Sequence, residues 1–289
     1  MICNLCPNRC NVDRATRLGA CLTPADRVAV NRAAPHFYEE PPISGQRGSG
    51  TIFFGGCTMR CRYCQNIAIS RVPRGRMCTA ADLVDLIKGL EDQGVHNINF
   101  VTPTHASHLI RAALDRYRPA VPVVYNTSGY ECVEVVQALA PYVDIWLPDF
   151  KYADRALADS LSGRPDYPRF ALAAIAEMLR QKPCLYRDGL MRQGVLIRHL
   201  VLPGHVDASR RALDALRTLG KPALSLMAQF TPMPLCPELN RPVKPIEYKA
   251  VLSYAEKLGF DDIFIQEPES TGTQYIPPFE LSNEGNRNP

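Results

Sequence analysis

The sequence predicts an α/β protein built from parallel strands joined by helical crossovers. From residue 51 onward, short runs rich in Val, Ile, Leu and Phe alternate with helical stretches. The expected strands span 51–56, 97–103, 121–127, 143–150, 194–204 and 223–230, with a closing strand at 262–266. The expected helices span 79–93, 105–117, 131–140, 154–161, 168–181, 207–219 and 246–258. An open doubly wound sheet and a full or partial (β/α) barrel both fit this alternation.

Each kind of element follows from a local signal. Apolar runs without polar alternation are typical of parallel strands that are buried on both faces. Thr79 is a helix N-cap and Gly94 a stop signal, which bounds the first helix. Polar segments such as TPTH, NTSG, PDFK and LPGH follow the strands directly. Because ligands bind at the carboxyl ends of parallel strands in both architectures, we expect a site there.

Composition excludes several classes of protein. The 289 residues are 46% hydrophobic and 21% charged, which is ordinary for a globular protein. A net charge of +4 without a long Lys/Arg run predicts no nucleic-acid partner. No apolar run approaches the length of about 18 residues that a membrane span needs. Eleven cysteines and no opening signal peptide predict a cytoplasmic protein with reduced thiols.

The cysteines form two groups near the N-terminus. The first group has the spacing C-x2-C-x3-C-x10-C and consists of Cys3, Cys6, Cys10 and Cys21. Four thiolates in so short a segment predict a metal site, and both zinc and a [4Fe-4S] cluster suit such ligands. The scattered cysteines read as small buried hydrophobic residues and are Cys78, Cys132, Cys184 and Cys236.

The second group is the stretch GGCTMRCRYCQN, in which Cys57, Cys61 and Cys64 have the spacing C-x3-C-x2-C. Three thiolates can hold three irons of a [4Fe-4S] cube, which leaves the fourth iron open to another ligand. Gly55 and Gly56 let the backbone pass close to a bulky inorganic group. A zinc or structural cluster site completed by a distant fourth cysteine is the alternative.

This stretch resembles the signature of the radical S-adenosylmethionine (SAM) superfamily, C-x3-C-x-Φ-C, with Tyr63 at the aromatic position. The resemblance implies a partial (β/α)6 barrel in which Cys57, Cys61 and Cys64 hold a [4Fe-4S] cluster. It implies that SAM binds the open iron and is cleaved reductively to a 5′-deoxyadenosyl radical, which abstracts a substrate hydrogen. An electron donor of the flavodoxin or ferredoxin type is implied as a partner.

From about residue 45 to 266 the chain resembles the activating enzymes of glycyl radical enzymes, including pyruvate formate-lyase activating enzyme and its uncharacterised relatives. The implied substrate is a glycine Cα–H in a partner protein. Another peptide or a small molecule stays open as the substrate, because fold and superfamily do not fix it. Two classes of rival also stay open, namely a non-catalytic iron–sulfur electron-transfer protein and a zinc-dependent interaction module.

The resemblance to the activating enzymes also implies contacts to SAM, and no catalytic side chain is assigned. Asn126 and Ser128 match a DTNG motif, and Asp149 and Lys151 match an L-D-x-K segment. Arg198 matches the arginine of I-R-Y-V-V-V-P-G, which lies near the SAM carboxylate in those enzymes. A plain Asp149–Lys151 ion pair is the alternative for those two residues. The residues predicted to contact SAM are Tyr63, Thr102, Pro103, Thr104, Asn126, Ser128, Asp149, Lys151, Arg198 and His199.

The predicted organisation has four parts. Residues 1–24 form a cysteine-rich metal-binding module, and residues 25–50 form an irregular connector because they are rich in Pro and Gly. Residues 51–276 form the partial barrel. Residues 277–289 are polar and are expected to form a flexible tail.

Overall fold

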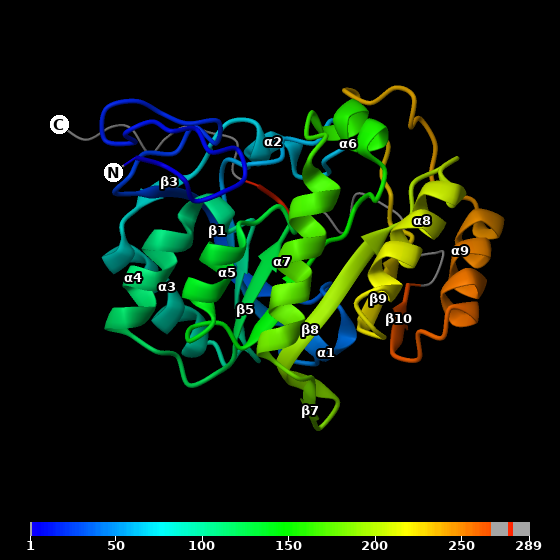
Figure 1. Ribbon diagram of the computed structural model, residues 1–289. Coiled ribbons are helices and arrows are strands. Elements are labelled where there is room, and N and C mark those ends of the chain that lie inside the picture. The colour runs from blue at the N-terminus through cyan, green and yellow to red at the C-terminus, as the bar shows by residue number, and fades with distance from the viewer. Residues whose placement is uncertain (1, 267–276, 280–289) are drawn as a thin grey trace.

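The computed structural model describes residues 2–266 and 277–279, and its centre is a single curved sheet (Figure 1). Strands β2 (Ser49–Phe54), β4 (Ile98–Val101), β5 (Val123–Thr127), β6 (Ile145–Pro148), β8 (Leu190–Leu200), β9 (Ala223–Met227) and β10 (Ile263–Ile265) are parallel neighbours in that order. All the strands expected from the sequence are therefore present. The tail expected after residue 276 lies, apart from 277–279, outside the described residues.

The strand order decides between the two predicted architectures. Parallel strands follow one another across the sheet in chain order, whereas a doubly wound sheet reverses its order at a switch point. The sheet ends at β10 on one side and β3 (Arg76–Cys78) on the other, and within the described residues these ends do not pair. The fold is thus the open, partial barrel, and the doubly wound alternative is wrong.

Helices cover the outside of this sheet. They are α3 (Ala80–Glu91), α4 (Ser107–Arg116), α5 (Val133–Leu139), α6 (Arg155–Ser162), α7 (Tyr167–Gln181), α8 (Val206–Arg217) and α9 (Pro245–Lys257). Neighbouring helices pack together in chain order, α3 on α4, α4 on α5 and α8 on α9. Thr79 caps α3, as the sequence predicts, and it forms a reciprocal capping box with Asp82. Phe100, Tyr125 and Trp146, on three successive strands, are fully buried in the core.

The segment before residue 51 differs from the prediction. Residues 25–50 are not an irregular connector, because they contain strand β1 (Val28–His36) and the short helix α1 (Pro41–Ser44). β1 pairs antiparallel with both β2 and β3. Since His36 pairs with Ser49 at the start of β2, the chain after β1 turns under the amino ends of the strands. This turn brings Glu39 and Glu40 into the interior, where both are buried.

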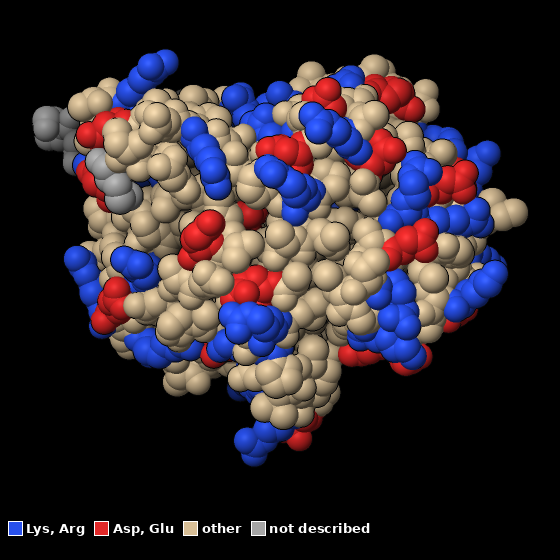
Figure 2. Space-filling model, in the orientation of Figure 1, with Lys and Arg blue, Asp and Glu red and all other residues tan. Residues whose placement is uncertain are grey.

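The remaining short elements are α2 (Ile67–Ser70), the 3-10 turn η1 (Thr104–Ala106) and β7 (Leu185–Arg187), which forms an unpredicted hairpin with β8. Among the described residues, no helix has the length and apolar character needed to cross a bilayer. On the face drawn in Figure 2, basic and acidic side chains are interspersed.

The N-terminal cysteine module lies against the carboxyl ends of the first strands. The Arg14 side chain is 2% exposed and donates to the carbonyl oxygens of Thr23 at 2.9 Å, Pro24 at 2.7 Å and His105 at 3.1 Å. Because a buried guanidinium needs all of its donors satisfied, Arg14 fixes the module to the turn after β4.

Candidate active site

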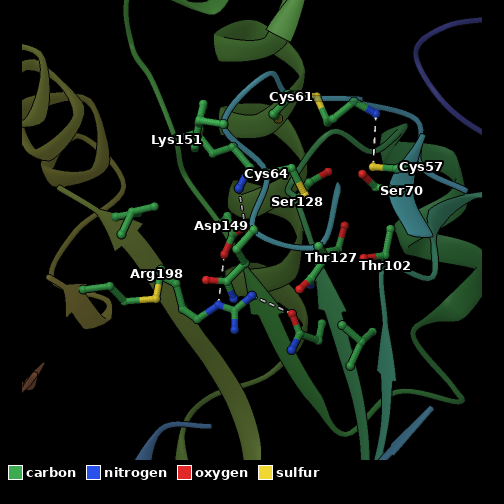
Figure 3. Close-up of a pocket in the computed structure, with 18 of the residues that line it drawn as sticks. Cys57, Cys61, Cys64, Ser70, Thr102, Thr127, Ser128, Asp149, Lys151 and Arg198 are labelled. Carbon is green, nitrogen blue, oxygen red and sulfur yellow. Dashed lines mark hydrogen bonds and ion pairs between the residues drawn. The ribbon is translucent and has the colours of Figure 1, made fainter. Parts of the chain in front are cut away.

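A cavity opens at the carboxyl ends of the parallel strands, and most of the predicted site residues line it (Figure 3). The loop 57–66 forms one wall, and residues at the ends of β4, β5, β6, β8 and β9 form the rest. The predicted residues that line it are Cys57, Cys61, Tyr63, Cys64, Thr102, Asn126, Ser128, Asp149, Lys151 and Arg198. The topology therefore brings these side chains, which are spread along the sequence from position 57 to position 198, together at one edge of the sheet.

The loop that follows β2 presents its three thiols to this cavity. Gly56 has φ +86°, and a Cβ there would lie 2.7 Å from the Cys21 carbonyl oxygen, so only glycine fits. The Met59 N–H donates to Cys57 Sγ at 3.4 Å, and the Ser162 hydroxyl donates to Cys61 Sγ at 3.1 Å. Donors aimed at sulfur favour thiolate over thiol.

The electrostatics of Cys57 and Cys64 fit a bound metal cluster. Burial, together with the nearby Cys61 and Cys57 thiols, raises the pKa of Cys64 to about 12. Burial and Cys61 raise the pKa of Cys57 in the same way. The raised pKa values of Cys57 and Cys64 disfavour their ionisation, and both become thiolates when iron compensates their charge, since metal ligation deprotonates cysteine. Soft thiolates are the ligands that iron–sulfur clusters use.

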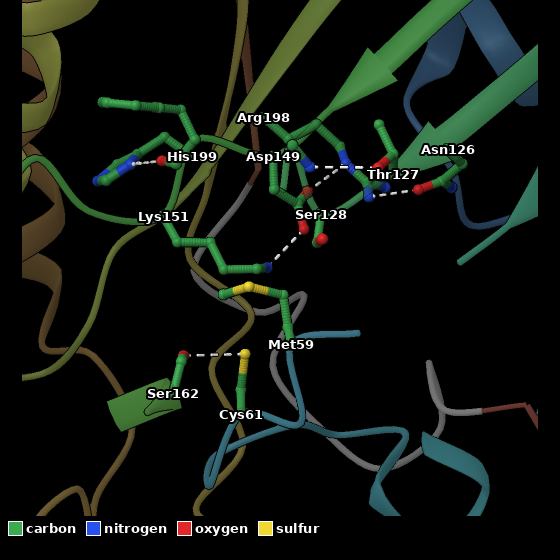
Figure 4. A network of polar contacts seen from close by, with 12 residues as sticks. Met59, Cys61, Asn126, Thr127, Ser128, Asp149, Lys151, Ser162, Arg198 and His199 are labelled. Carbon is green, nitrogen blue, oxygen red and sulfur yellow. Dashed lines mark hydrogen bonds and ion pairs between the residues drawn. The ribbon is translucent and has the colours of Figure 1, made fainter. Parts of the chain in front are cut away.

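Arg198 is the centre of a buried polar network opposite these thiols (Figure 4). Its guanidinium donates to Asp149 Oδ1 at 2.9 Å, to Glu39 Oε2 at 3.1 Å and to Asn126 Oδ1 at 2.6 Å. Lys151 Nζ pairs with Asp149 Oδ2 at 2.5 Å. The side chains of Arg198, Asp149 and Lys151 are each less than a fifth exposed.

The charges of this network support one another. Burial acts to raise the pKa of Asp149, but Arg198 and Lys151 outweigh it and the pKa is lowered. Burial likewise acts to lower the pKa of Lys151, and Asp149 raises it overall. Asp149 and Lys151 therefore form an ion pair, the alternative that the sequence left open, and the pair still lines the cavity.

Glu39 is a member of the network that the sequence analysis missed. Its Oε1 accepts from Asn99 Nδ2 at 3.3 Å and from Asn126 Nδ2 at 3.0 Å, while Oε2 accepts from Arg198. Glu39 and Glu40 lie in a segment whose sequence predicts a loop. No sequence motif connects these two residues with the polar residues at the strand ends. Only the turn after β1 brings Glu39 under β4, β5 and β8.

Thr102 has a strained backbone at the edge of the cavity. Its φ is +61°, a conformation that is costly for a β-branched residue, and its N–H donates to the Asn126 carbonyl oxygen at 2.9 Å. Strain of this kind persists where the surrounding structure enforces it and clusters at functional sites. Thr102 lines the cavity, and its contact to SAM stays a prediction.

Three predicted contacts do not reach the cavity. His199 follows Arg198 on β8, so its side chain points to the opposite face of the strand, where Nδ1 lies 2.7 Å from the Phe150 carbonyl oxygen. Thr104 begins η1 and donates to the buried Glu131 at 2.6 Å. Pro103 precedes this turn and is not among the residues that line the cavity. Strand alternation and the turn after β4 are the physical reasons.

The N-terminal cysteines lie behind the 57–66 loop. Cys3, Cys6 and Cys21 are buried, and Cys10 Sγ accepts from the Ala20 N–H at 3.3 Å. Burial raises the pKa of Cys6 to about 12, and the thiols of Cys21 and Cys10 add to this effect. Across residues 2–266 and 277–279, no three Cys, His, Asp or Glu side chains are grouped to hold a single metal ion. The metal of this module therefore stays a prediction.

The fold and the three-thiol cavity define a class of protein. The family model of the radical SAM superfamily matches residues 51–216, and the chain belongs to this superfamily. A [4Fe-4S] cluster and SAM are the cofactors of this class, and Cys57, Cys61 and Cys64 fit the cluster.

Several known proteins are similar to this chain. Uncharacterized protein MJ0674 of Methanocaldococcus jannaschii is 29% identical over 276 residues, which are 91% of this chain and 76% of that protein. A radical SAM methyltransferase from Sphaerobacter thermophilus superposes with a TM-score of 0.53 at 16% identity, covering 93% of this chain and 83% of the other. SuiB of Streptococcus suis, bound to its precursor peptide SuiA, has a TM-score of 0.52 at 15% identity. The match covers 73% of this chain and 47% of SuiB, so this chain spans less than half of SuiB.

Proposed function

We propose that this protein cleaves SAM reductively and abstracts a hydrogen atom from a glycine residue of a partner protein, as glycyl radical enzyme activators do. Another peptide substrate is the second candidate. The observation that carries the proposal is the convergence of three thiols and the Arg198–Asp149–Lys151 network on one cavity. An electron-transfer protein would need the thiols but not the opposing network.

In this proposal Cys57, Cys61 and Cys64 hold the cluster. When bound, the cluster supplies one electron that breaks the S–C5′ bond of SAM, giving methionine and a 5′-deoxyadenosyl radical that takes hydrogen from the substrate. The electron comes from a donor of the flavodoxin or ferredoxin type.

The chain's own residues bind and orient SAM. Lys151 is a cation at the cavity wall, and a SAM carboxylate can pair with it because Asp149 uses one of its three donors. Arg198 holds Asp149 in place beside Lys151. Asn126 and Ser128 contribute amide and hydroxyl groups at the end of β5, and Thr102 contributes main-chain atoms at the end of β4.

The N-terminal cysteine module is proposed to carry a second metal site. Asn8 Nδ2 donates to the Thr58 carbonyl oxygen at 2.9 Å, and the Cys21 carbonyl oxygen lies against Gly56. The module thus contacts the loop that holds Cys57, and metal binding there would stabilise this loop.

The cofactor part of the proposal is tested by SAM binding to the reconstituted protein. We expect Lys151→Gln to weaken SAM binding about tenfold or more, because a charge-assisted bond to carboxylate is lost. Lys249→Gln, at an exposed lysine outside the cavity, is the matched control and should bind normally. Equal affinity of Lys151→Gln and the unaltered protein would remove Lys151 from the SAM site.

The substrate part is tested by electron paramagnetic resonance on a candidate glycyl radical enzyme incubated with the reduced protein and SAM. The expected result is a glycyl radical doublet that disappears when the target glycine of the partner is replaced by alanine. Formation of 5′-deoxyadenosine without any glycyl radical would favour another peptide substrate.

A further inference from the structure

A second cavity adjoins the first one beneath the Arg198 network. It lies between the segment after β1 and the strands β9 and β10, and Gln229 lines both cavities. Its walls include Phe37, Glu39, Glu40 and Ile265. A molecule in this second cavity would therefore lie next to the proposed site of SAM cleavage.

The charged side chains that line the second cavity are all acidic. Glu39 and Glu40 are the charged residues among those described as lining it. The charge of Glu39 is matched by Arg198 at 3.1 Å. Glu40 forms no ion pair within the described part of the chain, although only 7% of it is exposed. Arg198 also favours the charged form of Glu40, but burial outweighs it and raises the pKa of Glu40, so the carboxylate charge is compensated only in part.

One oxygen of Glu40 also lacks a hydrogen bond. Glu40 Oε2 is buried and has no partner among the described residues. A buried carboxylate oxygen without a donor is costly, so native structures rarely leave one unless a bound group completes it. The missing group has to be a donor, and because the charge of Glu40 is compensated only in part, a cationic donor is the better match.

The rim of the cavity suits an organic cation rather than a metal ion. Phe37 is 54% exposed and Ile265 is 56% exposed, so apolar surface surrounds the entrance. Aromatic faces attract ammonium and guanidinium groups, and apolar surface packs against an aliphatic stem. A hydrated metal ion would gain nothing from these side chains.

We propose that the second cavity is a substrate subsite in which Glu40 binds an ammonium or guanidinium group carried on an apolar stem, such as a lysine or arginine side chain. The role as a substrate subsite rests on the proposed function, because the adjoining cavity is where hydrogen abstraction would occur. Cation binding itself does not depend on that reaction. The cation would give Glu40 Oε2 its donor and complete the compensation of the Glu40 charge.

The test measures binding of butylguanidinium to the cluster-loaded protein by ligand-observed nuclear magnetic resonance. Butylurea is a neutral analogue of similar shape. We expect saturable binding of butylguanidinium and much weaker binding of butylurea. Glu40→Gln should weaken butylguanidinium binding at least tenfold, since a hydrogen bond to a charged group is lost. Glu134→Gln, at an exposed glutamate of α5, is the matched control and should bind normally.

A second variant keeps the test decisive if Glu40→Gln unfolds. Phe37 is exposed, so Phe37→Ala should fold and should weaken binding about threefold through the lost cation–aromatic contact. A capped Gly-Arg-Gly peptide and agmatine then distinguish a peptide side chain from a free amine as the source of the cation. Equal binding of butylguanidinium and butylurea, or unchanged binding in both variants, would overturn the subsite.

If the proposed function is wrong, the experiments give a different result from the one that would overturn the subsite. In that case the same protein preparation would yield no 5′-deoxyadenosine from SAM, while butylguanidinium binding and its loss in Glu40→Gln would persist. Normal SAM cleavage with no selective binding of butylguanidinium would contradict the subsite alone.

Discussion

Glu39 and Arg198 form an ion pair at 3.1 Å although 159 residues separate them in the sequence. The side chain of Glu39 is 8% exposed and that of Arg198 is 14% exposed. Arg198 also holds Asp149, so one guanidinium serves two buried carboxylates. The segment after β1 is thereby joined to the ends of β6 and β8, directly under the candidate SAM site.

Replacing Arg198 should therefore destabilise the fold strongly. We expect Arg198→Met to lower the free energy of unfolding by about 3–5 kcal/mol, because the buried Glu39 loses its described cationic partner and Asp149 loses one of two. The matched control is Arg118→Met, since Arg118 pairs with Asp144 at 3.1 Å on the surface. That change should cost less than about 1 kcal/mol. Urea denaturation measures both, and similar losses in the two variants would contradict the central role of Arg198.

Glu131 should give the protein a measurable pH dependence. It is fully buried, Oε1 accepts from Thr104 at 2.6 Å and from Thr127 at 2.5 Å, and Oε2 has no partner among the described residues. Burial raises its pKa from 4.5 to about 7. The folded protein then binds a proton more tightly than the unfolded chain, so this contribution to stability is present below pH 4.5 and is lost as the pH rises to 7.

The measurement compares the protein with Glu131→Gln at pH 5 and pH 8. From the pKa difference, Glu131 should cost the unaltered protein up to about 3 kcal/mol of unfolding free energy between pH 5 and pH 8. The Glu131→Gln variant should not show this loss. Taking the difference between the two proteins removes the contributions of other titrating groups. Glu134→Gln, at an exposed position three residues away, should keep the normal pH dependence. Parallel stability curves for Glu131→Gln and the unaltered protein would show that Glu131 titrates normally.

The N-terminal cysteines should bind metal independently of the cavity thiols. We expect Cys10→Ser to lose the metal of the N-terminal module, seen as about four fewer irons for a cluster or about one fewer zinc. Elemental analysis of the purified protein measures this. Cys184 is exposed, contrary to the expectation from the sequence, and Cys184→Ser should leave the metal content unchanged. A full metal content in Cys10→Ser would remove Cys10 from the predicted ligand set.

The sequence was most informative where elements are buried on both faces. The strands from residue 51 onward read as apolar runs, and the structure has each of them. Strand β1 escaped prediction because VAVNRAAPH contains Asn, Arg and Pro and lies beside a Pro-rich segment. The β7–β8 hairpin escaped because its residues are largely exposed and carry little periodic signal.

The sequence predicted that the site lies at the carboxyl ends of the strands. It did not predict in which direction each side chain points. Asp149, Lys151 and Arg198 reach the cavity because each lies at or beyond the carboxyl half of a strand. His199 was placed beside Arg198 without regard to the two-residue alternation of a strand, which turns it away. The contact of Glu39 with Arg198 could not be predicted from the sequence, because it depends on the turn after β1 and hence on the pairing of β1 with β2.

Cys61 gives the most direct test of the radical chemistry. Its thiol accepts from Ser162 at 3.1 Å and lines the cavity with Cys57 and Cys64. The measurement is 5′-deoxyadenosine formed from SAM by protein reconstituted with iron and sulfide without oxygen and then reduced with dithionite. We predict product from the unaltered protein and from Cys184→Ala, and none from Cys61→Ala, which should still fold. Undiminished product from Cys61→Ala would contradict the assignment of the cluster to these three cysteines.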